Sequence, residues 1–364
     1  MPEVRLPFYA RLALGLLSGV LIFYGLSKGQ LVFVPLVFSV LLAAFLYPMS
    51  KWLERRMRMS SALAAFLSVL AFLLLISAFT YFLSFQLIGF AQDIPRLQGR
   101  LNDWSAGLQR WIAREYGVDS STQTEYANGV ADGLLENAAN SAGLVFLGVG
   151  SFVFWTLIVF VYTFFILYHR RMLVQALVLM FRSQHRAEVK MTIDESRTVT
   201  NNYVKGLLIE AGAVAATLGV AFTILGIKYA ILLALISAVV NVIPYLGIVV
   251  SMALVALVTL TNHSPATALW AVGIRYVIHF LDANLLVPRV IGSKVRINAL
   301  VTLLGVLAGG ALWGVAGTFL AIPLTAALKI VFSHIPGMKP WALMMDVEGK
   351  DEGVKEEKSV RQVS

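Results

Sequence analysis

Apolar residues fall into eight long runs along the chain, and shorter polar stretches separate them. The runs span about residues 8–27, 31–49, 61–90, 143–168, 205–226, 229–260, 265–281 and 298–331. A helix of about 20 residues crosses the hydrocarbon core of a bilayer, which is about 30 Å thick. The pattern therefore predicts an all-α polytopic membrane protein.

Two of these runs, 229–260 and 298–331, contain residues that interrupt a helix. Proline removes a backbone donor, and glycine permits a sharp turn. The interrupting residues are Asn241, Pro244 and Gly247 in the first run and Gly309, Gly310, Gly314 and Pro323 in the second. We expect about six full transmembrane helices plus two broken or re-entrant hairpins, with two kinked single spans as the alternative. Paired broken segments are typical of transporter sites, because freed backbone groups must face protein or a water-filled cavity.

The polar stretches divide the chain into segments. We predict transmembrane helices over 1–91, a helical extracytoplasmic insertion over 92–142, a further helix over 143–168, a cytoplasmic amphipathic linker over 169–204, a transmembrane core over 205–337 and a disordered cytoplasmic tail over 338–364. In the insertion, apolar residues recur every three or four positions from Ile94 to Trp111, so the helix of 61–90 is expected to continue beyond the membrane. A second helix is expected over about 124–139. Two interpretations stay open: a helical hairpin that packs on itself or on a neighbouring subunit, or a lid over a substrate path.

Basic residues in the short loops predict the orientation of the chain. Arginine and lysine crowd the link between the second and third runs and the link after the fourth, and both links should be cytoplasmic. The acidic insertion then lies outside, and both termini lie inside. Arg289, Lys294 and Arg296 stay inside only if both interrupted runs enter and leave by the same face.

Composition agrees with this interpretation and excludes several functions. Hydrophobic residues make up 59% of the 364 residues and charged residues only 13%, and the net charge is +9. The positive charge lies in loops between apolar runs, which indicates membrane orientation rather than nucleic-acid binding. Without cysteine, disulfides and cysteine-ligated metals are excluded. Phosphate-loop, metalloprotease and serine-hydrolase motifs are absent, so we predict a non-enzyme with no catalytic residue, cofactor or bound metal.

Charged and amide side chains within the apolar runs are the candidate functional residues. Arg275, His279 and Asp282 are spaced i, i+4, i+7 and so share one helix face. An ionisable residue at this depth is costly and normally pairs inside the bundle or marks an ion or substrate path. The transport or coupling candidates are Glu210, Arg275, His279, Asp282, Asn284 and Arg289, together with Asn241 of the broken run. Two roles stay open: Asp282 and Glu210 carry a coupling charge, or Asp282 forms a structural ion pair with Arg275 or Arg289.

Several blocks of sequence resemble the autoinducer-2 exporter family of bacterial membrane proteins. The blocks are Tyr203-Val204-Lys205-Gly206, then Gly226, then Asn241-Val-Ile-Pro244-Tyr245-Leu-Gly247, then Asp282-Ala-Asn-Leu-Leu-Val-Pro288-Arg289-Val-Ile-Gly292, and then Gly309-Gly310, Gly314, Gly317 and Ala321-Ile-Pro323. Two positions depart from the family pattern: Asp282 stands where glutamate is more usual, and Asn298-Ala299 replaces a His-Pro pair.

The resemblance implies a secondary exporter or permease of the bacterial inner membrane that assembles as a homo-oligomer. Members are associated with export of a small polar quorum signal and, in other cases, with sodium/proton antiport. We therefore expect a secondary transporter whose partners are membrane lipids and either a small polar solute or a monovalent cation, with a Na⁺(Li⁺)/H⁺ antiporter as the alternative. A passive pore or an oligomeric membrane scaffold is the alternative from another class.

Overall fold

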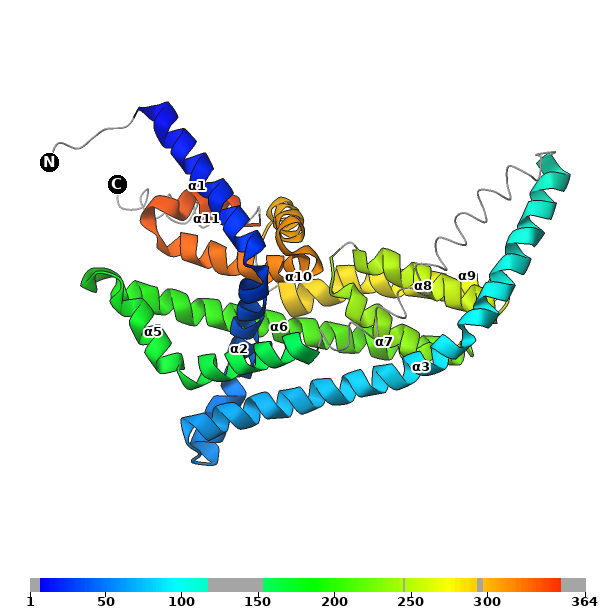
Figure 1. Cartoon of the computed structure of the whole chain (residues 1–364), viewed down its shortest axis with the longest axis horizontal. Helices are drawn as coiled ribbons and strands as arrows, with labels where there is room; N and C mark the ends of the chain where they lie inside the picture. The colour runs from blue at the N-terminus through cyan, green and yellow to red at the C-terminus, as the bar shows by residue number, and fades with distance from the viewer. Residues whose placement is uncertain (1–6, 117–152, 245, 293–296, 348–364) are drawn as a thin grey trace, which may run out of the picture. The chain divides into compact units, whose positions relative to one another are not determined.

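The computed structural model describes residues 7–116, 153–244, 246–292 and 297–347, and all regular structure in these ranges is helical (Figure 1). The α-helices are α1 (Phe8–Lys28), α2 (Gln30–Arg56), α3 (Ser61–Tyr116), the helix Val153–Tyr168, α5 (Arg170–Leu179), α6 (Arg186–Ile224), α7 (Ala230–Asn241), α8 (Leu246–Asn262), α9 (Pro265–Leu281), α10 (Ala299–His334) and α11 (Lys339–Met344). Short 3-10 turns lie at Ser183–His185 and Pro336–Met338, and π-helical turns at Asp282–Leu286 and Pro288–Gly292. The predicted all-α class is confirmed.

Six helices within these ranges are long and apolar enough to cross a membrane, and up to seven if one bent pair counts as a span. The bent pair joins Val153–Tyr168 to α5 at 70°. Large apolar side chains cover the outside of these helices, and α1 buries none of its residues. Lipid is an apolar solvent, so such a surface suits a bilayer. The prediction of a multi-pass membrane protein agrees with this architecture.

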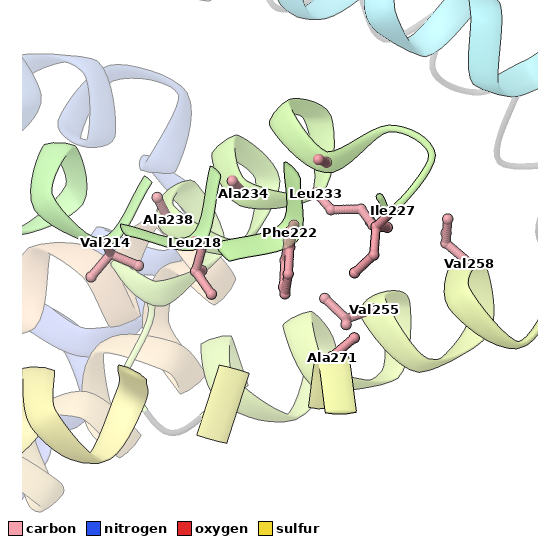
Figure 2. Packing of buried hydrophobic residues seen from close by; sticks show 11 residues of the cluster. Val214, Leu218, Phe222, Ile227, Leu233, Ala234, Ala238, Val255, Val258 and Ala271 are labelled. Carbon is pink, nitrogen blue, oxygen red and sulfur yellow. The ribbon is translucent and has the colours of Figure 1, made fainter. Parts of the chain in front are cut away.

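The chain divides into two compact units, and the first contains Leu31–Arg171 and Val204–Val290. Its main apolar core joins the second half of α6 to α7, α8 and α9. Figure 2 shows ten of these side chains, from the four helices and from Ile227 between α6 and α7: Val214, Leu218, Phe222, Ile227, Leu233, Ala234, Ala238, Val255, Val258 and Ala271. Ala230 belongs to the same core. A second core joins α2, the start of α3 and Val153–Tyr168, and there Ser39 Oγ donates to the Val159 carbonyl at 3.0 Å.

The α7–α8 pair forms a hairpin at the break that the sequence predicts. Its two ends meet, because the Lys228 amide donates to His263 Nε2 at 3.2 Å across 35 positions of sequence. At the turn, Gly247 lies against the end of α7. A Cβ on Gly247 would stand 2.3 Å from the Val240 carbonyl oxygen, so only glycine permits this approach.

The second unit contains Met1–Gln30, Met172–Tyr203 and Ile291–Ser364, and α10 is its largest helix. Trp313 and Gly314 leave helical geometry, with φ = +59° at Gly314, and the chain reverses there. Gly305 consequently faces Thr325, although 20 residues of straight helix would hold them about 30 Å apart. Gly309 and Gly317 touch through their backbones at the crossing.

The first residues of the predicted disordered tail are ordered. Residues 336–344 form a 3-10 turn and α11, because Asn298 bonds to this segment: its amide donates to the Met345 carbonyl at 3.0 Å and its side chain to the Met344 carbonyl. Asn298 also caps α10, since its Oδ1 accepts from the Val301 amide at 2.8 Å. The tail prediction is therefore wrong for 338–347, and 348–364 lie outside the described residues.

One other expected boundary differs from the structure, and one agrees with it. The helix expected over 205–226 begins at Arg186, so the second half of the predicted linker is continuous with it as α6. The third helix continues beyond the apolar run to Tyr116, as its periodicity predicts. The second helix expected near 124–139 lies outside the described residues.

Candidate functional site

The side chain of Asn241 stands at the centre of a buried polar network in the first unit. Its Nδ2 donates to Glu210 Oε1 at 3.1 Å and to Asp282 Oδ2 at 3.0 Å. Both carboxylates are largely buried, with 7% of Glu210 and 5% of Asp282 exposed. One amide nitrogen thus holds together two acids that are 72 positions apart in the sequence.

The network also contains a fully buried arginine. Arg275 is 0% exposed, its Nη2 donates to Asn241 Oδ1 at 3.0 Å, and its Nε donates to Ser251 Oγ. Asn241 therefore separates the guanidinium from the two acids while bonding to all three. We call Glu210, Asn241, Ser251, Arg275 and Asp282 the Asn241 cluster.

The cluster continues the apolar core along the same helix faces. On α6, Glu210 lies one turn before Val214 on the buried stripe, and on α8, Ser251 lies one turn before Val255. On α9, Arg275 follows the buried Ala271 by four positions. Because these helix faces pack together in the core, the polar side chains one turn further along the same faces also lie close to one another.

Asn241 reaches the centre because α7 ends there. It is the last residue of α7, just before the break at 242–245, and its side chain points to helices that a continuous span would have passed. Two of the predicted interrupting residues form this turn: Pro244 lies within it, and Gly247 packs against the end of α7. Gly309, Gly310, Gly314 and Pro323 belong to the α10 hairpin of the other unit.

Three buried polar atoms at the cluster have no hydrogen-bond partner among the described residues: Arg275 Nη1, His279 Nδ1 and Asp282 Oδ1. His279 lies between the other two on the face that the i, i+4, i+7 spacing predicts. Nearly all buried polar groups in proteins are paired, and unpaired ones at membrane depth are expensive. Two donors or potential donors and one acceptor are thus available to bind a small polar group or ion.

The structure does not bring every predicted residue into this network. Asn284 is exposed and its Nδ2 donates to the Phe280 carbonyl at 2.8 Å, while Arg289 is exposed beyond it. The helix widens to a π-helical turn from Asp282, which changes the direction of the side chains that follow. The sequence does not predict Ser251 as a member of the cluster, because a serine in an apolar helix usually bonds to the backbone of its own helix and has no distinctive spacing.

The cluster can hold charge, but its ligands do not form a polydentate metal site. Within the described ranges no group of three or more histidine, cysteine, aspartate or glutamate side chains is placed to bind a metal ion. Two carboxylates and one guanidinium leave a single net negative charge when all three are ionised. A proton or a monovalent cation is the ligand that this charge balance favours.

Known proteins resemble this chain over most of its length. The sequence model described as "AI-2E family transporter" matches residues 14–337. "Putative transport protein YueF" of Bacillus subtilis is 28% identical over 347 residues, which cover 88% of this chain and 92% of that protein. "Putative permease PerM" of Escherichia coli (strain K12) is 28% identical over 249 residues, covering 67% of this chain and 70% of that protein.

A shorter match shows higher identity. "Putative transport protein YrrI" of Bacillus subtilis is 32% identical over 138 residues, covering 38% of this chain and 39% of that protein. The family match extends from α1 to the end of α10 and includes every residue of the Asn241 cluster. The chain therefore belongs to the AI-2E transporter family of membrane proteins, as the motifs between Tyr203 and Pro323 indicate.

Proposed function

We propose that this protein is a secondary transporter that moves a small polar solute and couples the movement to a proton or monovalent cation bound at the Asn241 cluster. The observation that carries the proposal is the amide of Asn241 shared between Glu210 and Asp282 beside the buried Arg275. The names of the relatives give transport without a solute or a direction, and from the family resemblance we propose a solute of the quorum-signal type and export as the direction.

Charge balance explains how such a site couples. With its three ionisable groups charged, the empty cluster carries one net negative charge, and it becomes neutral when it holds one proton or one monovalent cation. A buried net charge is costly in a protein surrounded by lipid. The loaded cluster therefore favours the closely packed arrangement of α6, α7 and α9, and unloading favours a looser one. A solute path that opens and closes with this packing is driven by the ion gradient.

The broken helix adds to the attraction for a cation. The carboxyl end of a helix carries a partial negative charge, because its last carbonyl groups point away from the helix. At the end of α7, the Val242 and Ile243 amides donate to the carbonyls of Val239 and Val240, and Asn241, the last residue of the helix, lies at this negative end. Discontinuous helices commonly form ion sites in secondary transporters in this way.

Counterflow in proteoliposomes tests the proposal. Proteoliposomes that contain the protein are preloaded with each of a panel of small polar solutes. Uptake of the labelled solute is then followed under an imposed gradient of pH, Na⁺ or Li⁺. We expect Glu210→Gln and Asp282→Asn to lose gradient-driven uptake. Asp194→Asn is the matched control, because Asp194 lies in the other unit and pairs with Arg197 at the surface. Normal transport by Asp282→Asn rules out the coupling role.

Na⁺(Li⁺)/H⁺ antiport is the second candidate, and the pair of acids favours it. Two carboxylates that share one donor can exchange a cation for a proton with no further substrate. Flux of ²²Na⁺ driven by a pH gradient in vesicles without solute identifies this function. Solute flux that requires no gradient and does not saturate identifies instead a passive pore, and the absence of solute and cation flux favours a scaffold.

The two hairpins support a membrane topology with both termini in the cytoplasm of a bacterial inner membrane. The start of α7 and the end of α8 meet through the bond between Lys228 and His263. The residues before and after α10 likewise meet, because Asn298 bonds to Met345. Each hairpin therefore begins and ends on the same side. At about 1.5 Å per residue, the 12 residues of α7 extend only about 18 Å, too short to cross the bilayer. Cysteines introduced at Asn262 and Lys294 should label from opposite faces, and labelling from the same face contradicts this topology.

A further inference from the structure

The basic end of α2 carries a pocket that plays no part in the proposed transport site. It is an open hollow of about 600 Å³ within the first unit. Its lining residues recur along one face of the helix, at i, i+1, i+4, i+5, i+8 and i+9: Tyr47, Pro48, Lys51, Trp52, Arg55 and Arg56. The pocket thus changes from an aromatic wall to a cationic rim over the last three turns of α2.

The rim keeps its positive charge. Glu54 is the acidic residue of α2; it does not line the pocket and pairs with Arg170, with 14% of each side chain exposed. In the described part of the chain, no carboxylate lies within ion-pair distance of Lys51, Arg55 or Arg56. The Lys51 ammonium stays at the pocket, since its Nζ lies 5.5 Å from the centre of the Tyr47 ring.

The position of the pocket along α2 matches a membrane interface. The apolar run of α2 ends where the cations begin, and Trp52, with 58% of its surface exposed, stands at that boundary. Tryptophan is enriched at headgroup depth, and arginine and lysine at the cytoplasmic end of a span. An occupant here meets phosphate-binding groups on one side and apolar walls on the other.

We infer that this pocket binds the phosphodiester headgroup of an anionic phospholipid. Arginine and lysine donate charge-assisted hydrogen bonds to phosphate oxygens. Tyr47, Pro48 and Trp52 form the wall that the glycerol and the first acyl carbons contact. Free inorganic phosphate shares the charge but gains nothing from that wall, so the walls favour the lipid as the source of the phosphate.

Brominated lipids test this inference with the full-length protein in phosphatidylcholine vesicles. Bromine on acyl chains quenches nearby tryptophan, and the difference between the wild type and Trp52→Phe isolates the Trp52 signal. We expect brominated phosphatidylglycerol to quench Trp52 more strongly than brominated phosphatidylcholine at the same fraction. Each cation that is removed should lower the affinity for the anionic lipid about fivefold. The double variant Arg55→Gln/Arg56→Gln should therefore lower the preference for phosphatidylglycerol over phosphatidylcholine about 25-fold.

The matched control is Arg182→Gln/Lys190→Gln, which removes two exposed charges that do not line the pocket and should keep the preference. Each variant is compared with its own Trp52→Phe form and checked for a monodisperse gel-filtration peak. Equal quenching by the two lipids overturns the inference, and so does an equal loss in the control, which indicates a general surface-charge effect. Loss of the preference in excess inorganic phosphate shows a free-anion site and also overturns it.

Discussion

Replacement of Asn241 by alanine removes a side chain that bonds to both acids and to the buried arginine. The deleted amide makes three hydrogen bonds, at 3.1, 3.0 and 3.0 Å, and each has a charged partner. Hydrogen bonds to charged groups contribute about 1.5–3 kcal/mol each, which gives a range of about 4–9 kcal/mol for three. Water that enters the space recovers part of this. We expect the free energy of unfolding to fall by about 3–5 kcal/mol, the usual cost of unpairing a buried charge.

Reversible unfolding in mixed detergent micelles, followed by tryptophan fluorescence, measures this change. Asn284→Ala is the matched control, because Asn284 is an exposed asparagine with a single bond to the Phe280 carbonyl. Exposed substitutions usually change stability by less than about 0.5 kcal/mol. Equal destabilisation by the two variants refutes the central role of Asn241, and wild-type stability of Asn241→Ala refutes the network itself.

Three further predictions concern packing and capping, and thermal unfolding in detergent measures each of them. Gly309→Ala should destabilise the protein by about 2 kcal/mol or more, because the new Cβ would stand 2.4 Å from the Gly317 carbonyl oxygen in the second half of α10. The control is Gly19→Ala, whose Cβ would meet no atom within 4 Å, so this change should be neutral or slightly stabilising. Asn298→Ala should cost about 1 kcal/mol through the lost cap and expose α11 to limited proteolysis. A double-mutant cycle on Glu54→Gln and Arg170→Gln should give a coupling energy of about 1–3 kcal/mol, and a value near zero contradicts the half-buried ion pair.

The sequence contained enough information to locate most of the cluster. The i, i+4, i+7 spacing of Arg275, His279 and Asp282 needs only helix geometry, and a charge in an apolar run is visible at once, as at Glu210. The break after Asn241 follows from Pro244 and Gly247. These predictions depend on local rules, and the structure places the residues on the expected faces.

Pairing between helices was not predictable in the same way. Ser251 joins the cluster because the α7–α8 hairpin lays it beside Arg275, and no spacing within α8 indicates that contact. Asn284 and Arg289 were grouped with Asp282 by proximity in sequence, but the π-helical turn directs them elsewhere. The order of 338–347 likewise depends on Asn298, some 46 positions away from its partner Met344.

The buried arginine also has a consequence for how the chain enters the membrane. Pro265–Val290 is the least apolar of the six candidate spans, and Arg275 alone opposes insertion of a lone helix by roughly 2.5–3.5 kcal/mol. Its acceptors, on Asn241 and Ser251, lie earlier in the chain and are synthesised first. The order of synthesis therefore supplies the guanidinium with partners as soon as α9 leaves the ribosome. A chain with α9 moved ahead of α7 would hold the same residues and lose that advantage during biogenesis.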